Sequence, residues 1–301
     1  LTNSAAKNAK LEAAGAGAIV LKSLFEEQIM MEADRLRNPS YYPEGSDYLA
    51  EYIRNHKLAE YLELIKESKK VCTIPVIASI NCYTDAEWVD FAKQIEEAGA
   101  DALEINILAL QSDIQYKYGS FEQRHIDILS HIKKTIRIPV IMKLGSNFTN
   151  PVALIDQLYA NGAAAVVLFN RFYQPDIDVE KMEHTSGDVF SNASDLSTTL
   201  RWIGISSSLV SKIDYAASGG IHKPDGIVKA ILAGASAIEI CSAIYQNTNL
   251  FVGEMNRFLS AWMERKGFKH ISQFKGKLNA KDVEGINMFE RTQFLKYFSE
   301  K

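Results

Sequence analysis

The segment Ala98-Gly99-Ala100-Asp101-Ala102-Leu103-Glu104-Ile105 joins the end of a helical pattern to a short apolar run. A glycine closing a helix adopts positive φ at no steric cost, and the apolar run after it is typical of a buried parallel strand. The same pattern recurs in residues 14–21, 161–168 and 233–240. Four copies indicate that one helix–turn–strand unit is repeated along the chain.

A second pattern opens two further strands with Ile-Pro-Val-Ile, in residues 74–81 and 138–144. Proline is tolerated at the first residue of a strand, where its missing N–H breaks no ladder hydrogen bond. The two prolines are separated by nearly the same interval as Gly99 and Gly162. This spacing predicts a β-α-β-α module that is used more than once.

Helical periodicity fills the intervals between the strands. The predicted helices cover residues 85–98, 121–134, 151–160, 224–232 and 249–266. Thr84 and Asn150 are the expected N-caps, with Pro151 at the first helical position. The predicted strands end near residues 21, 81, 106, 143, 170, 218 and 240.

Seven strands that alternate with helices favour a parallel sheet in an α/β fold. Because Leu1 leads straight into a helical pattern without a start methionine, we expect a preceding strand to have been cut off or processed. Eight strands close a (β/α)8 barrel, so residues 1–301 are predicted to form a single barrel domain. A doubly wound open sheet is the alternative, but no GxGxxG motif opens a helix.

Composition excludes several classes of protein. The 301 residues are 47% hydrophobic and 23% charged, unlike disordered, collagen-like or coiled-coil chains. The net charge of -4 argues against a nucleic-acid partner. Cys72, Cys82 and Cys241 lack CxxC spacing, which disfavours a disulfide framework and a zinc site, and no apolar stretch suits a membrane span. We therefore expect a cytoplasmic protein that holds no metal.

Polar residues follow the seven predicted strands, where a (β/α)8 barrel places its chemistry. They are Lys22 with Ser23, Asn81, Asn106, Lys143, Asn170, Ser218 with Gly219 and Gly220, and Cys241 with Ser242. Any one of them could simply mark a strand that gives way to a loop. Seven together favour a binding site at the barrel mouth.

Each group suggests a different ligand chemistry. Gly219 and Gly220 after the seventh strand fit a phosphate cradle, because barrels bind phosphate in the loops after strands 7 and 8. Lys22 and Lys143 end apolar strands, where an ammonium is costly unless it faces an anion, an electron-rich ring or a carboxylate. Either lysine could instead reach solvent or form a Schiff base. The asparagines suit a flat heterocycle with alternating carbonyl and N–H groups, although asparagine is also common in turns.

These residues resemble the soluble class of FMN-dependent dihydroorotate dehydrogenases. The resemblance rests on Lys22-Ser23, Asn106, Lys143 in Pro-Val-Ile-Met-Lys-Leu, Asn170, Ser218-Gly219-Gly220-Ile221 and residues 225–243, and it covers nearly the whole chain. It implies FMN across the barrel mouth, with its phosphate at Gly219, Gly220, Cys241 and Ser242. It also implies a homodimer that acts on a dihydropyrimidine-like small molecule in pyrimidine biosynthesis.

The resemblance further implies roles for individual side chains. Lys22, Asn81, Asn106 and Lys143 would contact the flavin ring or the ribityl chain, while Asn106 and Asn170 would hold the pyrimidine. Lys22, Lys143 and Asn106 would be the catalytic residues. Lys143, near the N1–C2 edge of the flavin, would stabilise the negative charge of the reduced ring.

The chain departs from the family in the loop after Asn106. The family pattern is Asn-x-Ser-Cys-Pro-Asn, in which the cysteine removes a proton from dihydroorotate, but Ala109 stands at that position here. Alanine cannot accept a proton. The candidate replacements are Cys82, Ser112, Tyr116, Tyr118 and Ser120.

The family's substrate motif Asn-Ser-x-Gly-Leu-Pro-Asn is also replaced, by residues 38–53. Arg171 could pair with a substrate carboxylate, or equally with Asp176 or Asp178. The leading hypothesis is an FMN-dependent dehydrogenase acting on dihydroorotate or on another enone-type substrate. The alternatives are a barrel lyase with Lys22 or Lys143 as imine nucleophile, and a non-catalytic flavin-binding barrel.

Overall fold

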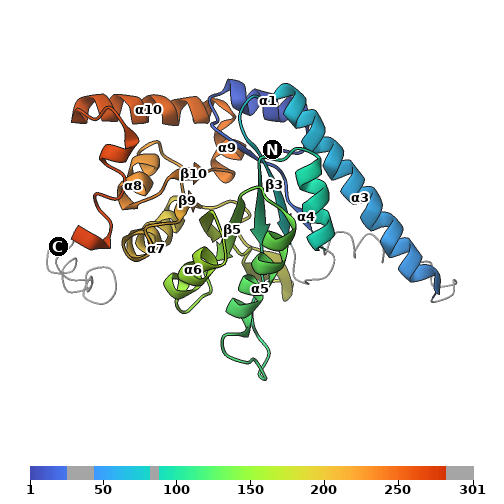
Figure 1. Ribbon diagram of the computed structural model, residues 1–301. Coiled ribbons are helices and arrows are strands. Elements are labelled where there is room, and N and C mark those ends of the chain that lie inside the picture. The colour runs from blue at the N-terminus through green and yellow to red at the C-terminus, as the bar shows by residue number, and fades with distance from the viewer. Residues whose placement is uncertain (26–43, 82–87, 283–301) are drawn as a thin grey trace. The chain divides into compact units, whose positions relative to one another are not determined.

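The computed structural model describes residues 1–25, 44–81 and 88–282 (Figure 1). The chain forms two compact units, Leu1–Met142 and Lys143–Lys301. In both units parallel strands alternate with helices, and the fold is of the predicted (β/α)8 class. No helix in the described ranges has the length and apolarity to cross a bilayer.

The first unit is built around strand β3. Its elements in chain order are α1 (Ala5–Ala13), β1 (Ile19–Val20), β2 (Leu24–Phe25), α3 (Glu44–Val71), β3 (Val76–Asn81), α4 (Trp88–Glu97), β4 (Ala102–Asn106) and α5 (Ser120–Thr135). Strand β3 pairs in parallel with β1, β2 and β4. Helices α3 and α4 contact each other beside this sheet (Figure 1). Strand β5 (Val140–Gly145) runs from this unit into the next.

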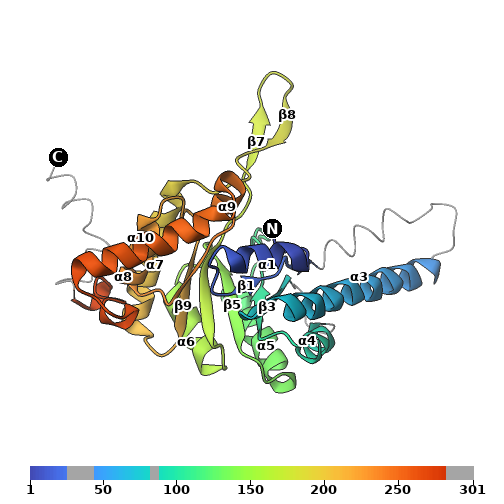
Figure 2. The same cartoon turned by 90° about the horizontal axis from the view of Figure 1, so that it is seen from above.

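The second unit has β9 at the centre of its parallel strands. Its elements are α6 (Pro151–Ala160), β6 (Ala165–Asn170), β7 (Pro175–Asp178), β8 (Glu183–Ser186), α7 (Leu196–Leu209), β9 (Asp214–Ser218), α8 (Asp225–Ala233), β10 (Ala237–Glu239), α9 (Ser242–Asn247) and α10 (Leu250–Lys266). Strand β9 pairs in parallel with β6 and β10. The antiparallel hairpin of β7 and β8 projects away from the rest of this unit (Figure 2).

The repeated glycines explain why the chain turns where it does. Gly15, Gly99, Gly162 and Gly234 all have positive φ, between 94° and 125°, within two residues after the ends of helices α1, α4, α6 and α8. Each is followed by a strand, as the repeat predicts. The predicted helix–turn–strand unit is therefore confirmed in all four copies.

Helix α6 begins as predicted. The Asn150 carboxamide oxygen accepts a hydrogen bond from the Ala153 N–H at 3.1 Å, and Pro151 occupies the first turn, where its missing N–H costs nothing. The other predicted helices agree with α4, α5, α8 and α10 to within one residue at the ends that are described. Thr84 lies outside the described residues. Helices α3 and α7 and the hairpin of β7 and β8 were not predicted.

Candidate functional site

Asn81 and Asn106 lie side by side at the carboxyl ends of β3 and β4. They are Cα partners in the parallel register, and both side chains are buried, with 6% and 4% exposure. Parallel pairing places equivalent strand ends at one edge of a sheet, so the structure brings together two of the predicted site residues.

The carboxamide oxygen of Asn106 is an unused hydrogen-bond acceptor. Its Oδ1 is buried and makes no hydrogen bond within the described part of the chain, and the same holds for the Nε2 donor of Gln111 in the following loop. A buried polar atom without a partner costs roughly 1–3 kcal/mol. A ligand that offers an N–H to Asn106 and an acceptor to Gln111 would remove this cost. Gln111 was not among the predicted site residues.

Ser23 joins a buried hydrogen-bonded network that was not predicted. Its hydroxyl lies 2.7 Å from the Ser79 hydroxyl, which donates to the Glu104 carboxylate at 2.9 Å. Since Ser79 uses its proton on Glu104, Ser23 donates to Ser79 and keeps its oxygen as an acceptor. Tyr61 braces the strand by donating to the Ser79 carbonyl and accepting from the Ser79 N–H. Burial raises the pKa of Tyr61, so its hydroxyl stays protonated.

The two predicted lysines have different surroundings. Lys22 is exposed, so its ammonium bears none of the desolvation cost inferred from the apolar strand before it. Lys143 on β5 is paired with Glu239 on β10, with 2.7 Å between Nζ and Oε2. Their side chains are only 18% and 20% exposed. Glu239 was not predicted as a site residue, because the two residues lie far apart in sequence.

Gly219 and Gly220 both have positive φ, at 88° and 73°. An added side chain would meet different surroundings at the two positions. A Cβ at Gly220 would lie 2.1 Å from the backbone nitrogen of Leu196, so this position requires glycine to admit the start of α7. A Cβ at Gly219 would meet only the Phe169 carbonyl oxygen, at 4.0 Å. Gly219 is therefore the residue with room for a ligand beside it.

Cys241 and Ser242 lie at the start of α9. The Ser242 hydroxyl accepts from the Ser191 N–H at 3.1 Å, and the Ser191 hydroxyl lies 2.9 Å from Nε2 of His222. Because Ser242 acts as an acceptor there, its own proton remains for another partner. Desolvation raises the pKa of Cys241 above its usual value. This thiol is consequently a poor base or nucleophile at neutral pH.

Asn170 ends β6 and Arg171 follows it. The Asn170 carboxamide oxygen accepts from the Arg171 N–H at 2.9 Å, which leaves the Nδ2 hydrogens of Asn170 available as donors. Arg171 donates to the Val189 carbonyl at 3.0 Å and lies 3.6 Å from Asp195. Its predicted partners Asp176 and Asp178 are therefore wrong. They lie on the projecting strand β7, whereas Asp195 directly precedes α7.

The candidate bases in the loop after Asn106 are mostly exposed. Ser112, Tyr118 and Ser120 are open to solvent, and Tyr118 is 94% exposed. Tyr116 donates to Glu122 at 3.3 Å. Cys82 lies outside the described residues. Among the described candidates, therefore, three are solvent-exposed and Tyr116 is hydrogen-bonded to Glu122, so none is identified as a substitute for the family's base.

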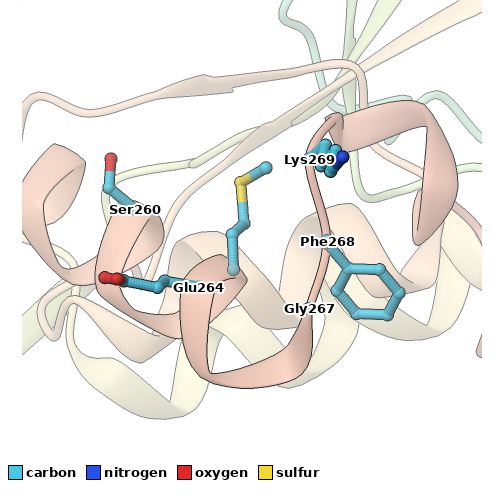
Figure 3. Close-up of a pocket in the computed structure, with 6 residues that line it drawn as sticks. Ser260, Glu264, Gly267, Phe268 and Lys269 are labelled. Carbon is cyan, nitrogen blue, oxygen red and sulfur yellow. The ribbon is translucent and has the colours of Figure 1, made fainter.

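Figure 3 shows an open hollow at the end of α10, between Ser260 and Lys269. Phe268, on its rim, stacks 5.2 Å from the ring of Phe274, which is fully buried. None of the predicted site residues lines this hollow. In residues 1–25, 44–81 and 88–282, no group of three or more His, Cys, Asp or Glu side chains could hold a metal ion.

Comparison with known proteins agrees with the resemblance. The family profile described as dihydroorotate dehydrogenase matches residues 5–263. The chain is 26% identical to the catalytic subunit of dihydroorotate dehydrogenase B (NAD(+)) from Thermoplasma volcanium, over 87% of this chain and 86% of the relative. It is 28% identical to the putative dihydroorotate dehydrogenase A (fumarate) from Aeropyrum pernix, over 79% of each chain. Because the profile spans well over half of the sequence, the protein belongs to the dihydroorotate dehydrogenase family of oxidoreductases.

Proposed function

We propose that this protein is an FMN-dependent dehydrogenase that oxidises dihydroorotate to orotate in pyrimidine biosynthesis. The bound FMN would supply the chemistry, by accepting at N5 the hydride that leaves C6 of the substrate. The observation that carries the proposal is the buried, unpaired carboxamide oxygen of Asn106. A flavin or a reduced pyrimidine offers the N–H group that this oxygen lacks.

The second unit has donors suited to the FMN phosphate. The backbone N–H groups of Gly219 and Gly220 make no hydrogen bond to the described residues. The Ser242 hydroxyl accepts a hydrogen bond from Ser191, so its own proton is also available for donation to a phosphate oxygen. Glycine lets phosphate oxygens approach backbone amides closely, and Gly219 has the open side that this requires. We assign the phosphate to Gly219, Gly220, Cys241 and Ser242.

The remaining strand-end residues would bind the ring system. We assign Lys22, Ser23, Asn81 and Asn106 to the flavin ring or the ribityl chain, and Ser23 would accept a hydrogen bond there. Lys143 would lie at the N1–C2 edge and Ser218 near the phosphate loop. Asn106 would share the pyrimidine with Asn170, whose free Nδ2 donors suit a carbonyl or carboxylate oxygen.

Ala109 favours a second candidate, an FMN-dependent oxidoreductase that acts on another enone-type or dihydropyrimidine substrate. Without a side chain able to take a proton, the deprotonation of dihydroorotate falls to a group outside the usual position. The lyase alternative is disfavoured. An imine-forming lysine must be neutral, but Lys143 is held beside a carboxylate and Lys22 is exposed.

The test is the visible spectrum of the purified protein, recorded before and after anaerobic addition of dihydroorotate. Yellow protein that bleaches supports the dehydrogenase. Yellow protein that bleaches only with another dihydropyrimidine or enone partner supports the second candidate, while protein that cannot be reconstituted with FMN refutes both. We also propose a homodimer, which sedimentation of the same sample would test.

A further inference from the structure

We infer that Glu239 is a positioning residue that holds Lys143 and offsets its charge, and thereby lowers the reduction potential of the bound flavin. The inference rests on the proposed function, since it takes Lys143 to contact the cofactor. Its structural basis is the 2.7 Å contact between Lys143 Nζ and Glu239 Oε2. This contact joins two strands, β5 and β10, within the second unit.

The pair differs from the surface ion pairs of the same unit. Lys229 and Asp225 also lie close together, at 2.6 Å, but they are one turn apart on α8 and 53% and 45% exposed. Solvent screens such exposed pairs. Lys143 and Glu239 are about four-fifths buried and are fixed by separate strands. Their charges therefore act on nearby groups with little screening.

A neighbouring group experiences both charges. The raised pKa of the Cys241 thiol is due first to desolvation, but Lys143 lowers it and Glu239 raises it. The two charges thus oppose each other at a third site close by. The same opposition would act on a flavin that touches Lys143.

This opposition has a direct electrostatic consequence for the cofactor. Reduction adds negative charge at the N1–C2 edge, and a lone ammonium there would stabilise the reduced form. The paired ammonium carries a compensating carboxylate, so the net charge of the pair is zero. Glu239 would keep Lys143 oriented as a hydrogen-bond donor while limiting how strongly the reduced cofactor is stabilised. Electrons would then pass on more readily to an acceptor.

A charge series tests the inference through the midpoint potential of the bound flavin, measured by equilibration with reference dyes. We expect Glu239→Gln, which removes the Glu239 carboxylate from beside the ammonium, to favour the reduced form about tenfold, or about +30 mV for two electrons. Lys143→Met should shift the potential in the opposite direction. The double variant Lys143→Met/Glu239→Gln should lie between the two. Asp225→Asn is the matched control, because it removes one carboxylate from an ion pair on α8.

The outcomes separate this inference from the proposed function. A Glu239→Gln protein that retains FMN with the potential of the wild type and of Asp225→Asn overturns the inference and leaves the cofactor assignment standing. If Glu239→Gln fails to fold, the double variant tests the inference instead, because it replaces both charged groups and so leaves neither of them buried alone. A double variant whose potential is no higher than that of Lys143→Met refutes the inference. Wild-type protein that takes up no FMN overturns both.

Discussion

Substituting the two adjacent glycines with alanine should have very different effects on stability. In Gly220→Ala the new Cβ would lie 2.1 Å from Leu196 N and 2.8 Å from Leu196 Cα, both backbone atoms that cannot rotate away. Left-handed backbone costs an alanine roughly 1–2 kcal/mol, and overpacking adds roughly 1–3 kcal/mol. Gly219→Ala carries only the first cost, because its Cβ meets nothing closer than 4.0 Å.

The measurement is urea or thermal unfolding of both variants, with FMN content determined on the same samples. We expect Gly220→Ala to lose roughly 2–5 kcal/mol and Gly219→Ala roughly 1–2 kcal/mol, with the lower Tm for Gly220→Ala. Equal losses would refute the steric reasoning. Loss of flavin from a Gly220 variant cannot locate the phosphate, since the backbone of α7 is displaced as well. Gly219→Ala is the diagnostic variant: folded protein with weakened FMN retention supports the phosphate assignment.

Two further predictions concern stability. Asn150→Ala should lower the free energy of unfolding by about 1 kcal/mol, because the Ala153 N–H loses its cap, and flavin content should not change. Desolvation lowers the pKa of the buried His125 from 6.5 to about 4. Between these pH values the unfolded state binds more protons, so the free energy of unfolding should fall by up to about 3 kcal/mol as the pH drops from 6.5 to 4. His125→Gln should flatten this slope in urea titrations at several pH values. An unchanged slope would remove His125 as its source.

The predictable part of the fold is the part that local physics determines. A helix often ends at a residue with positive φ, which glycine adopts without steric cost, and Gly99 and Gly162 fill this role regardless of their tertiary surroundings. The residues after each of them are mostly apolar and are buried as strands. The hairpin of β7 and β8 has no such signal. Every residue of β8 is exposed and Ile177 of β7 is 61% exposed, so the alternation that normally marks a half-buried strand is absent.

The sequence predicted which types of residue end the strands, but it did not predict the hydrogen-bond and ion-pair partners of their side chains. Polar residues at strand ends can be found by counting along each strand. The pairing of Lys143 with Glu239 depends on strands that are distant in sequence, and the link from Glu104 on β4 through Ser79 on β3 ends at Ser23, between β1 and β2. The sequence therefore suggested an ammonium that faces a ligand or a carboxylate, without identifying the carboxylate. The structure shows that cation beside a carboxylate, and a buried lysine that lacked such a partner would itself be destabilising. If Lys143 contacts a bound anion as proposed, the carboxylate that stabilises it in the fold would also limit how strongly it acts on that anion.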